Sequence, residues 1–456
     1  ENKVVLDVPN MPEGWKVATQ LKQEGNNRFS APSYHYFVDA PTVFAEKMTQ
    51  FSFKDQGTTF YLHFHGNYQG GQLVNEALIN GVRKICKEQA AIFGEKYPFE
   101  EYHFIYRLLP FRYRHAVEHM NSSSFTLPEG VTANPQALVG GLFGITAHEF
   151  FHSWNVKRIR PAALVPYDYS QPQYTSLHWF TEGITDYYSD LTLVRAGLID
   201  KENFYRRLAR VIDALDNNGA ASTISPATQS FDSWFETSDY AHPMHSVSFY
   251  TSGARLGLLI DAKLRGMTGG EKGLDEVFRG LYETYYKQGK GVPEDGVQKM
   301  IEKISGSSWD EFFNSYVHDV QPVDYSAILK PLGLELGAEM DSESGPRRLG
   351  IMRYSSGGQG ITIDRIHSKG DAYQGGMGQD DLIFMVNGKS ATEVDFDEIC
   401  NTLKKGEKLD LKVFRGIGIQ DVTITYQALF TPQASILKEK KKKNAFRDIW
   451  LKSLVK

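Results

Sequence analysis

The sequence predicts a multidomain α+β protein with β-rich segments at both ends and a mainly helical middle. Three observations lead to this fold class. The 456 residues exceed what one compact core usually holds. A hydrophobic share of 41%, with 28 Phe, 24 Tyr and 6 Trp, supplies ample core material and excludes disorder as the main state. The spacing of apolar residues also changes twice along the chain.

The first 70 residues alternate apolar and polar side chains in short runs. Residues 3–8 and 58–66 are the clearest runs, and Pro, Gly and Asn turns separate such pieces. This pattern predicts strands. Residues 1–70 are therefore expected to form an N-terminal β-rich segment.

From about Asn75 the apolar residues recur at intervals of three and four, which indicates helices buried on one side. Residues 71–335 are accordingly expected to form one mainly helical domain. Gly197 and Gly266 stand where helices commonly end. The expected helical segments are residues 75–93, 140–159, 178–196, 201–215, 250–265 and 274–286.

A third unit follows the run at 341–346, which favours neither helix nor strand and marks a linker. Residues 340–430 are expected to form a small β domain with one helix at 396–403. Its expected strands are 361–366, 381–386, 409–414 and 422–426. Residues 431–456 read as a charged C-terminal tail, and its lysine run at 438–443 as a solvated charge cluster.

Composition excludes several classes of protein. The net charge of −5 gives no basic excess for nucleic-acid binding. No apolar run reaches the length of a transmembrane helix. Cys86 and Cys400 form neither a disulfide framework nor a cysteine metal site, so any metal must use His and carboxylate. The chain begins at Glu1 without a leader pattern. The compartment stays open, with the bacterial periplasm or secretion favoured over the cytoplasm.

The strongest chemical signal is the His-Glu-x-x-His motif, His148-Glu149-Phe150-Phe151-His152. On a helix, positions i and i+4 lie on one face, so both imidazoles can bind one tetrahedral Zn²⁺. Glu149 then points aside and is free to act on water.

A catalytic zinc of this type needs a third protein ligand and leaves its fourth position to water. Glu182 follows His152 by 30 residues, in an aromatic setting, and is the candidate. Asp186 lies one helical turn further on and can accept the free N–H of a ligating His. One zinc ion per chain is expected.

The stretch from His148 to Pro161, followed by Glu182-Gly183, closely resembles the glycyl aminopeptidase family of zinc metallopeptidases. These are gluzincins related to thermolysin and to the aminopeptidase N group. The Trp-Asn-Val-Lys-Arg-Ile-Arg-Pro extension makes the resemblance more selective than the zinc motif alone. It covers about residues 70–330 and implies a thermolysin-like catalytic domain acting on peptides with small N-terminal residues such as Gly or Ala.

Two further roles follow from this resemblance. Tyr250, in Phe249-Tyr250-Thr251-Ser252-Gly253-Ala254, resembles the tyrosine that donates to the oxyanion in the aminopeptidase relatives. Glu118, in Val117-Glu118-His119-Met120-Asn121, resembles the family's anchor for the substrate α-amine. His115-Ala116 stand where the family has glycines, which puts exopeptidase specificity in question more than hydrolysis. His242 and His245 are close enough to Tyr250 to line the cleft.

The third unit resembles a PDZ domain. Arg348-Leu349-Gly350-Ile351 is similar to the carboxylate-binding loop, with Leu349, Gly350 and Ile351 as candidate peptide contacts. Such modules add a peptide as an extra strand. The sequence leaves open whether this unit binds protein C-termini or only packs on the catalytic domain.

These features predict a zinc aminopeptidase in which His148, His152 and Glu182 bind the metal and Glu149 takes a proton from water. One alternative is an endopeptidase with the same chemistry and no use of Glu118. Another is a scaffold in which the PDZ-like unit binds peptides and the peptidase is silent. Family members carry a larger N-terminal β domain, and only residues 1–70 could belong to one here. We therefore also expect this sequence to lack part of the cleft wall.

Overall fold

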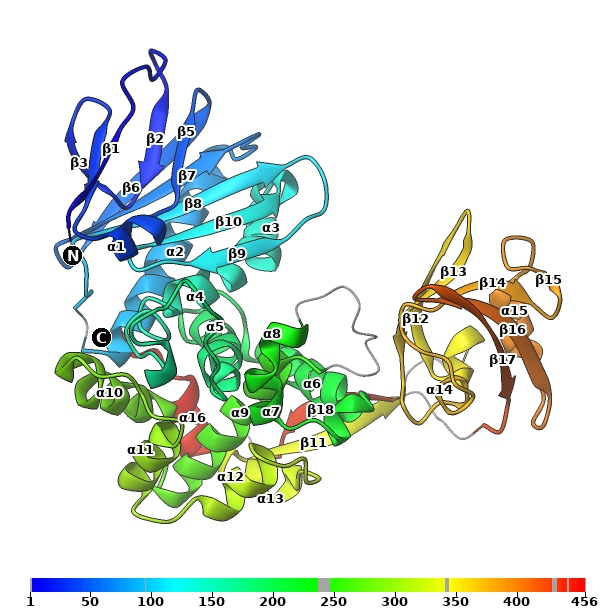
Figure 1. The fold of residues 1–456 in the computed structure, drawn as a ribbon. Coiled ribbons are helices and arrows are strands. Elements are labelled where there is room, and N and C mark those ends of the chain that lie inside the picture. Colours follow the sequence, from blue (N-terminus) through cyan, green and yellow to red (C-terminus); the bar gives the residue numbers. More distant parts are fainter. Residues whose placement is uncertain are drawn as a thin grey trace.

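The chain forms three regions in a computed structural model, which describes residues 2–94, 96–236, 247–340, 344–428, 433–440 and 443–455. Figure 1 shows β-sheets at the N-terminal end, helices in the middle and a separate β unit beyond them. The predicted order of a β-rich start, a helical middle and a β-rich third unit is confirmed. No helix of these residues is both long and apolar enough to cross a membrane.

Small sheets form the start of the chain. One sheet has the order β1-β4-β3, and β2 pairs with β5 in another. A short helix, α1 (Tyr34–Val38), follows β4, and the Ser33 side chain caps its start. The strands are β1 (Val4–Asp7), β2 (Lys16–Thr19), β3 (Lys22–Gly25), β4 (Arg28–Ala31) and β5 (Thr42–Ala45).

A larger five-stranded sheet has the order β6-β7-β8-β10-β9. Its strands are β6 (Met48–Asp55), β7 (Thr58–His65), β8 (Glu101–Leu109), β9 (His115–Glu118) and β10 (Ser122–Pro128). The sheet thus joins strands from both sides of the boundary expected at residue 70. Local periodicity did not predict this sheet, because the helix α2 (Gln72–Ile92) interrupts the strand pattern. Strands β7 and β8, on either side of α2 in the sequence, pair in parallel.

The helical region follows β10, and its main helices lie close to the segments predicted. The exception is 140–159, where the regular α-helix ends at Phe151 and residues 152–159 form turns. The helices are α3 (Pro135–Ala137), α4 (Phe143–Phe151), α5 (Ile184–Arg195), α6 (Lys201–Asp216), α7 (Pro226–Phe231), α8 (Ser233–Glu236), α9 (Phe249–Met267), α10 (Leu274–Thr284), α11 (Gly296–Ser305), α12 (Asp310–Tyr316) and α13 (Tyr325–Leu329).

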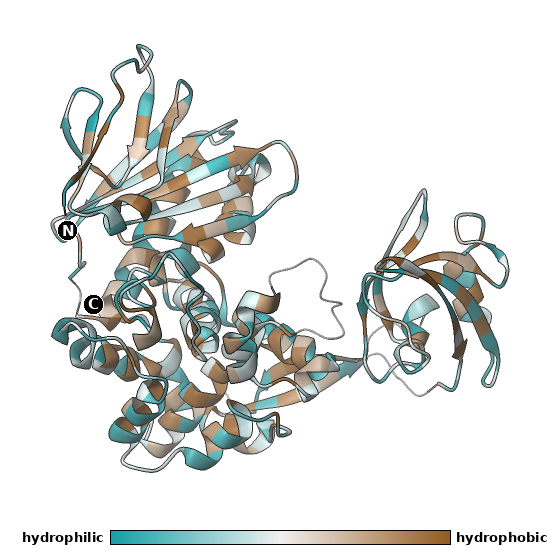
Figure 2. Cartoon of the chain, in the orientation of Figure 1, coloured by the Kyte–Doolittle hydropathy of each residue, from teal (hydrophilic) through white to brown (hydrophobic). Residues whose placement is uncertain are grey.

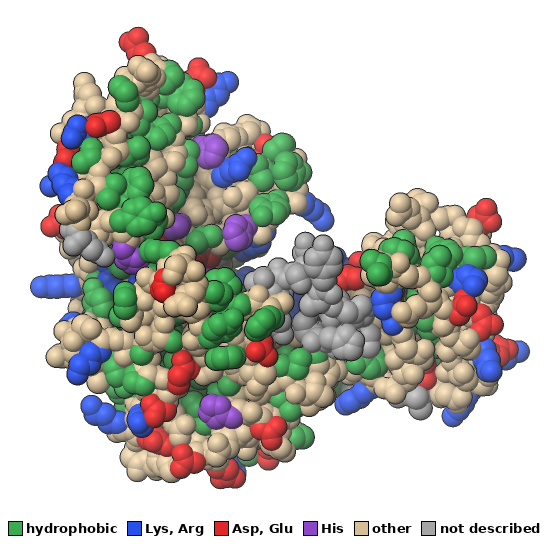
Figure 3. All heavy atoms as spheres, in the orientation of Figure 1, with side chains coloured by type: hydrophobic (Ala, Val, Ile, Leu, Met, Phe, Trp, Pro, Cys, Tyr) green, Lys and Arg blue, Asp and Glu red, His purple; other side chains and the backbone are tan. Residues whose placement is uncertain are grey.

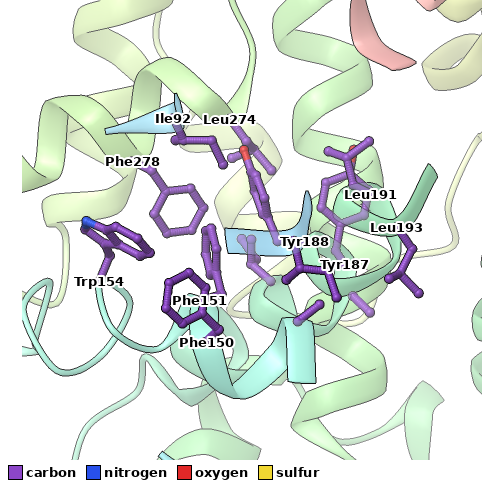
Figure 4. Close-up of a cluster of buried hydrophobic side chains, with 14 of the residues drawn as sticks. Ile92, Phe150, Phe151, Trp154, Tyr187, Tyr188, Leu191, Leu193, Leu274 and Phe278 are labelled. Carbon is purple, nitrogen blue, oxygen red and sulfur yellow. The ribbon is translucent and has the colours of Figure 1, made fainter. Parts of the chain in front are cut away.

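Aromatic packing fixes α4 in the centre of this region (Figure 4). Phe151 stacks on Tyr188 of α5 with ring centroids 4.6 Å apart, and it meets Phe278 of α10 edge to face. Trp154, fully buried, stacks on Phe93 at 4.7 Å. Such pairs add to the large hydrophobic gain from burying each ring. The helix that carries the His-Glu-x-x-His motif is therefore held rigidly by its apolar face.

The expected charged tail is instead part of the helical region. Strand β18 (Gln433–Glu439) pairs antiparallel with β11 (Leu334–Met340). Helix α16 (Ala445–Leu451) places Trp450, fully buried, in the core of the helical region, where its indole N–H donates to Tyr187 Oη at 2.8 Å. Lys438 pairs with Glu339, so this part of the lysine run belongs to a strand and is not merely solvated.

The C-terminal β unit has its own hydrophobic core. Its sheet has the order β12-β13-β14-β16-β17, and β15 pairs with β14. Hydrophobic and hydrophilic residues alternate along its strands (Figure 2). The elements are β12 (Ile351–Gly357), β13 (Gly360–Ile366), α14 (Asp371–Gln374), β14 (Leu382–Val386), β15 (Lys389–Ser390), α15 (Phe396–Thr402), β16 (Lys408–Arg415) and β17 (Gly418–Thr425).

Candidate active site

The His-Glu-x-x-His motif occupies the end of α4. His148 is 8% exposed and His152 is 1% exposed. Their Nε2 atoms lie 3.0 Å apart, which follows from the i, i+4 spacing on one helix face. Both imidazoles therefore present one nitrogen to the same point.

Glu182 reaches this point from a π-helical turn, Trp179–Gly183. Its Oε2 lies 3.5 Å from His148 Nε2 and 3.3 Å from His152 Nε2. Two imidazole nitrogens and one carboxylate oxygen are a donor set that suits Zn²⁺. The three residues predicted as ligands thus lie together, and they could hold a metal ion.

The outer nitrogens of both histidines are also engaged. His148 Nδ1 lies 2.8 Å from Asp186 Oδ1, and His152 Nδ1 lies 2.5 Å from the carbonyl oxygen of Asn155. Such contacts orient ligating imidazoles and fix which nitrogen faces the metal. The Asn155 side chain donates to the carbonyl of Phe180 at 3.0 Å. It thereby ties the turn after the motif to the segment that carries Glu182.

Burial and neighbouring charges shift the acid–base behaviour of the site. Burial raises the pKa of Glu149 to about 7, although the two imidazoles oppose this rise. Burial would also raise the pKa of Glu182, but the His152 and His148 imidazoles hold that pKa well below its usual range. One carboxyl is thus poised to exchange a proton near neutral pH, and the other stays ionised.

Tyr250 stands in the first turn of α9, beside the ligand cluster. Its ring centroid is 6.0 Å from that of His148. Desolvation and the Glu182 carboxylate raise the pKa of Tyr250, so its hydroxyl keeps its proton and can donate it in a hydrogen bond.

Two glycines allow α9 to come this close to the turn that carries Glu182. A Cβ on Gly183 would collide with the Cα of Gly253, and a Cβ on Gly253 would collide with the carbonyl of Trp179. Neither glycine has a positive φ in the structure, so close backbone approach is the requirement here. This packing explains in physical terms why glycine follows Glu182 and why Gly253 follows Tyr250 by three residues.

Glu118 ends the edge strand β9 and faces the same cluster. Oxygens of Glu118 and Glu149 and a ring nitrogen of His152 lie within 4.8 Å of one another. The buried Lys157 lies 4.0 Å from Glu118 and 2.9 Å from Asp39 of the N-terminal region. Burial would raise the pKa of Asp39, but hydrogen bonding by His119 and the Lys157 ammonium hold it at about 2.

Sequence reasoning assigned no role to Lys157, Arg158 or Asp39. Arg158 donates to the carbonyl of Met120 at 3.2 Å and to the Asn121 side chain at 3.1 Å. It therefore fastens the turn after α4 to the hairpin that carries Glu118. The Trp-Asn-Val-Lys-Arg extension of the motif is the sequence signal for Lys157 and Arg158. Asp39 gave no signal, since it lies in a segment interpreted only as strand.

A pocket of about 1010 Å³ opens beside Glu182 and Tyr250, with walls from the 164–173 loop and the start of α9. Figure 3 shows a hollow between the N-terminal sheets and the helical region, with histidines at its border. His242 and His245, which were expected near this cleft, lie outside the described residues.

The loop predicted to bind peptide C-termini lies at the start of β12. Leu349 is fully buried and Ile351 is 1% exposed, so their side chains belong to the core of the C-terminal unit. The Gly350 N–H donates to the carbonyl of Arg347 at 2.9 Å. Arg348 donates to the carbonyls of Cys400 and Leu403, where it caps the end of α15.

Comparison with known proteins finds two matching family models. A model of the M61 glycyl aminopeptidase family matches residues 141–256, and a model of the peptidase M61 N-terminal domain matches residues 2–46. The first match contains the cluster of His148, His152 and Glu182. The chain is a peptidase, and the matches support a metallo-aminopeptidase.

A solved structure shares the fold. An aminopeptidase N family protein from Idiomarina loihiensis is similar over 100% of this chain and 79% of its own, with a TM-score of 0.85 and 22% identity. An M1 zinc metallopeptidase mutant from Deinococcus radiodurans, bound to a Tyr-Ser-Ala substrate, is similar over 70% of this chain and 63% of its own, with a TM-score of 0.44 and 14% identity. Comparison with curated proteins finds no match.

Proposed function

We propose that the protein is a zinc-dependent aminopeptidase. This proposal rests on two clusters of possible ligand groups that share His152. One set is the donor triad of His148, His152 and Glu182, and the other is the carboxylate pair of Glu118 and Glu149. A metallopeptidase needs the first set, and an enzyme that recognises a free α-amine needs a carboxylate beside it.

A Zn²⁺ ion held by the triad would supply a Lewis acid, which makes hydroxide available near neutral pH. Glu149 is the general base in this proposal, since its pKa of about 7 lets it take a proton from water and return it to the leaving amine. Tyr250 donates a hydrogen bond to the carbonyl oxygen as negative charge develops on it.

Glu118 is proposed to bind the α-amine of the substrate. Lys157 already faces Glu118, but Asp39 is the closer partner of Lys157. The ammonium charge of Lys157 is therefore largely balanced by Asp39, which leaves Glu118 able to accept a substrate ammonium. Lys157 also restricts where the Glu118 carboxylate can lie. The proximity of Glu118 to Glu149 favours this exopeptidase reading over an endopeptidase.

The preference for Gly or Ala at the N-terminus is an expectation from the family resemblance. For the C-terminal unit we propose a PDZ-like fold. We propose that this unit packs on the catalytic domain and does not bind protein C-termini. Tyr354 of β12 donates a hydrogen bond to Asp397 of α15 across the face where such modules bind peptides, and the loop groups described above are satisfied within the unit.

The test is zinc-dependent release of a chromophore from glycyl and alanyl anilides, run beside the same compounds with acetylated amines. Metal is removed with a chelator and zinc is added back, and bound zinc is measured by atomic absorption. Cleavage of the free amines alone, lost on chelation and restored by zinc, supports an aminopeptidase. Cleavage of longer acetylated peptides would instead identify an endopeptidase, and inactivity of the zinc-loaded protein on all substrates would leave the scaffold alternative.

A further inference from the structure

The loop between β8 and β9 carries two exposed arginines, Arg112 and Arg114. Neither forms an ion pair or a hydrogen bond within the part of the chain that the structure describes. Protein nonetheless surrounds the Arg114 guanidinium closely enough for desolvation to lower its pKa, and the charge of Arg207 lowers that pKa further. Arg207 is itself paired with Asp190 at 2.6 Å. Among the described residues, Arg114 is therefore a cation without a counter-ion of its own, where a carboxylate would bind favourably.

Strand β9 connects this loop to Glu118. It begins at His115, next to Arg114, and ends at Glu118. It is the last strand of its sheet, and among the described residues only β10 pairs with it. The backbone groups of its outer edge are thus open to an added strand. Figure 1 shows β9 at the border of the sheet that faces α4, so a peptide bound along β9 would have its ends near Glu118 and Arg114.

The order of groups in the cleft gives this peptide a direction. The Glu118 carboxylate clusters with His152. Asp186, whose Oδ1 lies 2.8 Å from the outer nitrogen of His148, is one of the charged groups that act on Arg114. The proposed amine anchor therefore lies at the His152 end of the ligand cluster, and Arg114 lies at the His148 end. A substrate with its amine at Glu118 would cross the cluster and run antiparallel to β9 toward Arg114.

The length of β9 relates these two ends to the length of a substrate. Glu118 follows Arg114 by four residues, which is about 13 Å along a strand at ~3.4 Å per residue. An extended peptide of three or four residues spans about 10 to 13 Å. A dipeptide is too short to make both contacts. In a much longer peptide, a peptide bond and not a carboxylate would face Arg114.

We propose that Arg114 binds the C-terminal carboxylate of short peptide substrates, three or four residues long, while Glu118 binds their α-amine. The inference rests on the proposed aminopeptidase function and names its substrate class. Recognition of both ends would select such peptides over longer chains without any contact to their side chains. Arg112, in the same loop, adds positive charge that attracts the anionic end of a peptide.

The experiment measures kcat/KM of the zinc-loaded, full-length protein for alanine peptides of two, three, four and six residues, each as the free acid and as the C-terminal amide. We expect the acid to exceed the amide by about fivefold or more at three and four residues, and by less than about twofold at two and six. A ratio of one at every length, or the same ratio at every length, would overturn the proposal. Absence of cleavage of every free-amine peptide would instead refute the aminopeptidase function itself.

Variants of Arg114 test the contact directly. Arg114→Gln should lower kcat/KM for the acids by about fivefold and leave the amides within about twofold. Arg114→Lys should keep part of the preference, because it keeps the charge but loses the planar arrangement of donors. An equal loss on acids and amides for Arg114→Gln would contradict the assignment.

Arg107→Gln is the matched control for these variants. Arg107 is an exposed arginine of β8, the strand that leads into the same loop. Its neighbour Tyr106 forms a hydrogen bond with Thr146 of α4 at 2.9 Å. Because successive side chains of a strand point to opposite faces, Arg107 points away from α4. Arg107→Gln should therefore leave the ratio of acid to amide unchanged, and a loss equal to that of Arg114→Gln would show a general effect of charge.

A further substrate pair separates the peptide terminus from an acidic side chain. Ala-Ala-Glu amide offers only a side-chain carboxylate near Arg114, and we expect it to be cleaved no faster than Ala-Ala-Ala amide. Faster cleavage that Arg114→Gln abolishes would assign Arg114 to acidic side chains and overturn the proposal. Calorimetric titration of the Glu149→Gln variant with Ala-Ala-Ala, as acid and as amide, makes the same comparison without turnover. Equal Kd values for the two forms would also overturn it.

Discussion

Carboxylates and a tyrosine lie together in two regions of the molecule, the C-terminal unit and the cleft. The two regions differ in the groups that face these carboxylates. In the C-terminal unit, Asp397 accepts a hydrogen bond from Tyr354, and Arg348 donates to the free carbonyls at the end of α15. In the cleft, Glu118, Glu149 and Glu182 converge on two imidazoles, and Lys157 is the nearest ammonium to Glu118.

The two regions differ in what balances their carboxylates. Burying carboxylates close together is unfavourable unless cations or donors balance them. In the C-terminal unit, the chain supplies its own donors. In the cleft, the proposed metal ion and the ammonium of the proposed substrate would supply the balancing positive charge. The cluster of carboxylates and imidazoles in the cleft is therefore the proposed site of chemistry.

The largest effect is expected from removing the proposed general base. Glu149→Gln should keep zinc but lower kcat by about 10³-fold or more, because the amide cannot accept a proton from water. Zinc content and turnover would be measured on the same sample. Glu202→Gln is the control, since Glu202 is a largely exposed carboxylate at the start of α6. Retained turnover in Glu149→Gln would remove this residue from the mechanism.

The next effect concerns the amine anchor. Glu118→Ala should lower kcat/KM for free-amine substrates by about 10²-fold, since a partly buried charge pair with the substrate is lost. Any slow cleavage of N-acetylated peptides should be unchanged. Steady-state kinetics on matched free and acetylated substrates check this, and an equal loss on both would refute the anchoring role.

A smaller effect should appear in stability and its dependence on pH. The pKa of Asp39 is about 2 in the folded protein and about 3.9 in an unfolded chain. Its stabilisation, about 3 kcal/mol, is thus complete above about pH 5 and is lost as the pH falls through 2. Asp39→Asn should lower the free energy of unfolding by that amount at pH 7, and the deficit should shrink between pH 4 and pH 2.

Urea unfolding at several pH values measures this difference. Asp7→Asn serves as the control, because Asp7 likewise forms an ion pair, with Arg28, but is more than half exposed, and exposed pairs contribute little. A deficit for Asp39→Asn that stays constant down to pH 3 would show that the ion pair with Lys157 is not its source.

The smallest effect is expected in the C-terminal unit. Tyr354→Phe removes the hydrogen bond to Asp397 and should change the free energy of unfolding by about 1 kcal/mol or less. Calorimetric titration with a peptide ending in an apolar residue should show no binding to the wild type. Weak binding gained by Tyr354→Phe would indicate that this bridge closes a peptide groove, and clear binding to the wild type would refute the packing role.

Much of the site was predictable because its spacing is local. The interval from His148 to His152 fixes a helix face, and Asp186 follows Glu182 by about one turn. Lys157 and Asp39 were not predictable in the same way. Their pairing joins residues 118 positions apart, and the sequence around Asp39 contains no motif that states its partner.

The fold was predictable where periodicity was unbroken, as in α6, α9 and the strands of the C-terminal unit. The prediction of the fold failed in two places for the same reason. Strands β8 to β10 join a sheet begun before α2, and β18 joins β11 across the whole C-terminal unit. Pairings between distant segments leave no trace in local periodicity. The lysine run at 438–443 indicated a solvated tail, so no strand was predicted there. In the structure, Lys438 and Lys440 form ion pairs with glutamates of β11.

The antiparallel pairing of β11 with β18 makes the C-terminal β unit an insertion within the helical domain. The chain leaves that domain at β11, builds the inserted unit and returns to supply Trp450 to the core. During synthesis the catalytic core therefore cannot close until residues near 450 have left the ribosome. Until then, the buried pair of Tyr187 and Asp261 lacks its indole cover, and α5 of the nascent chain is only partly supported.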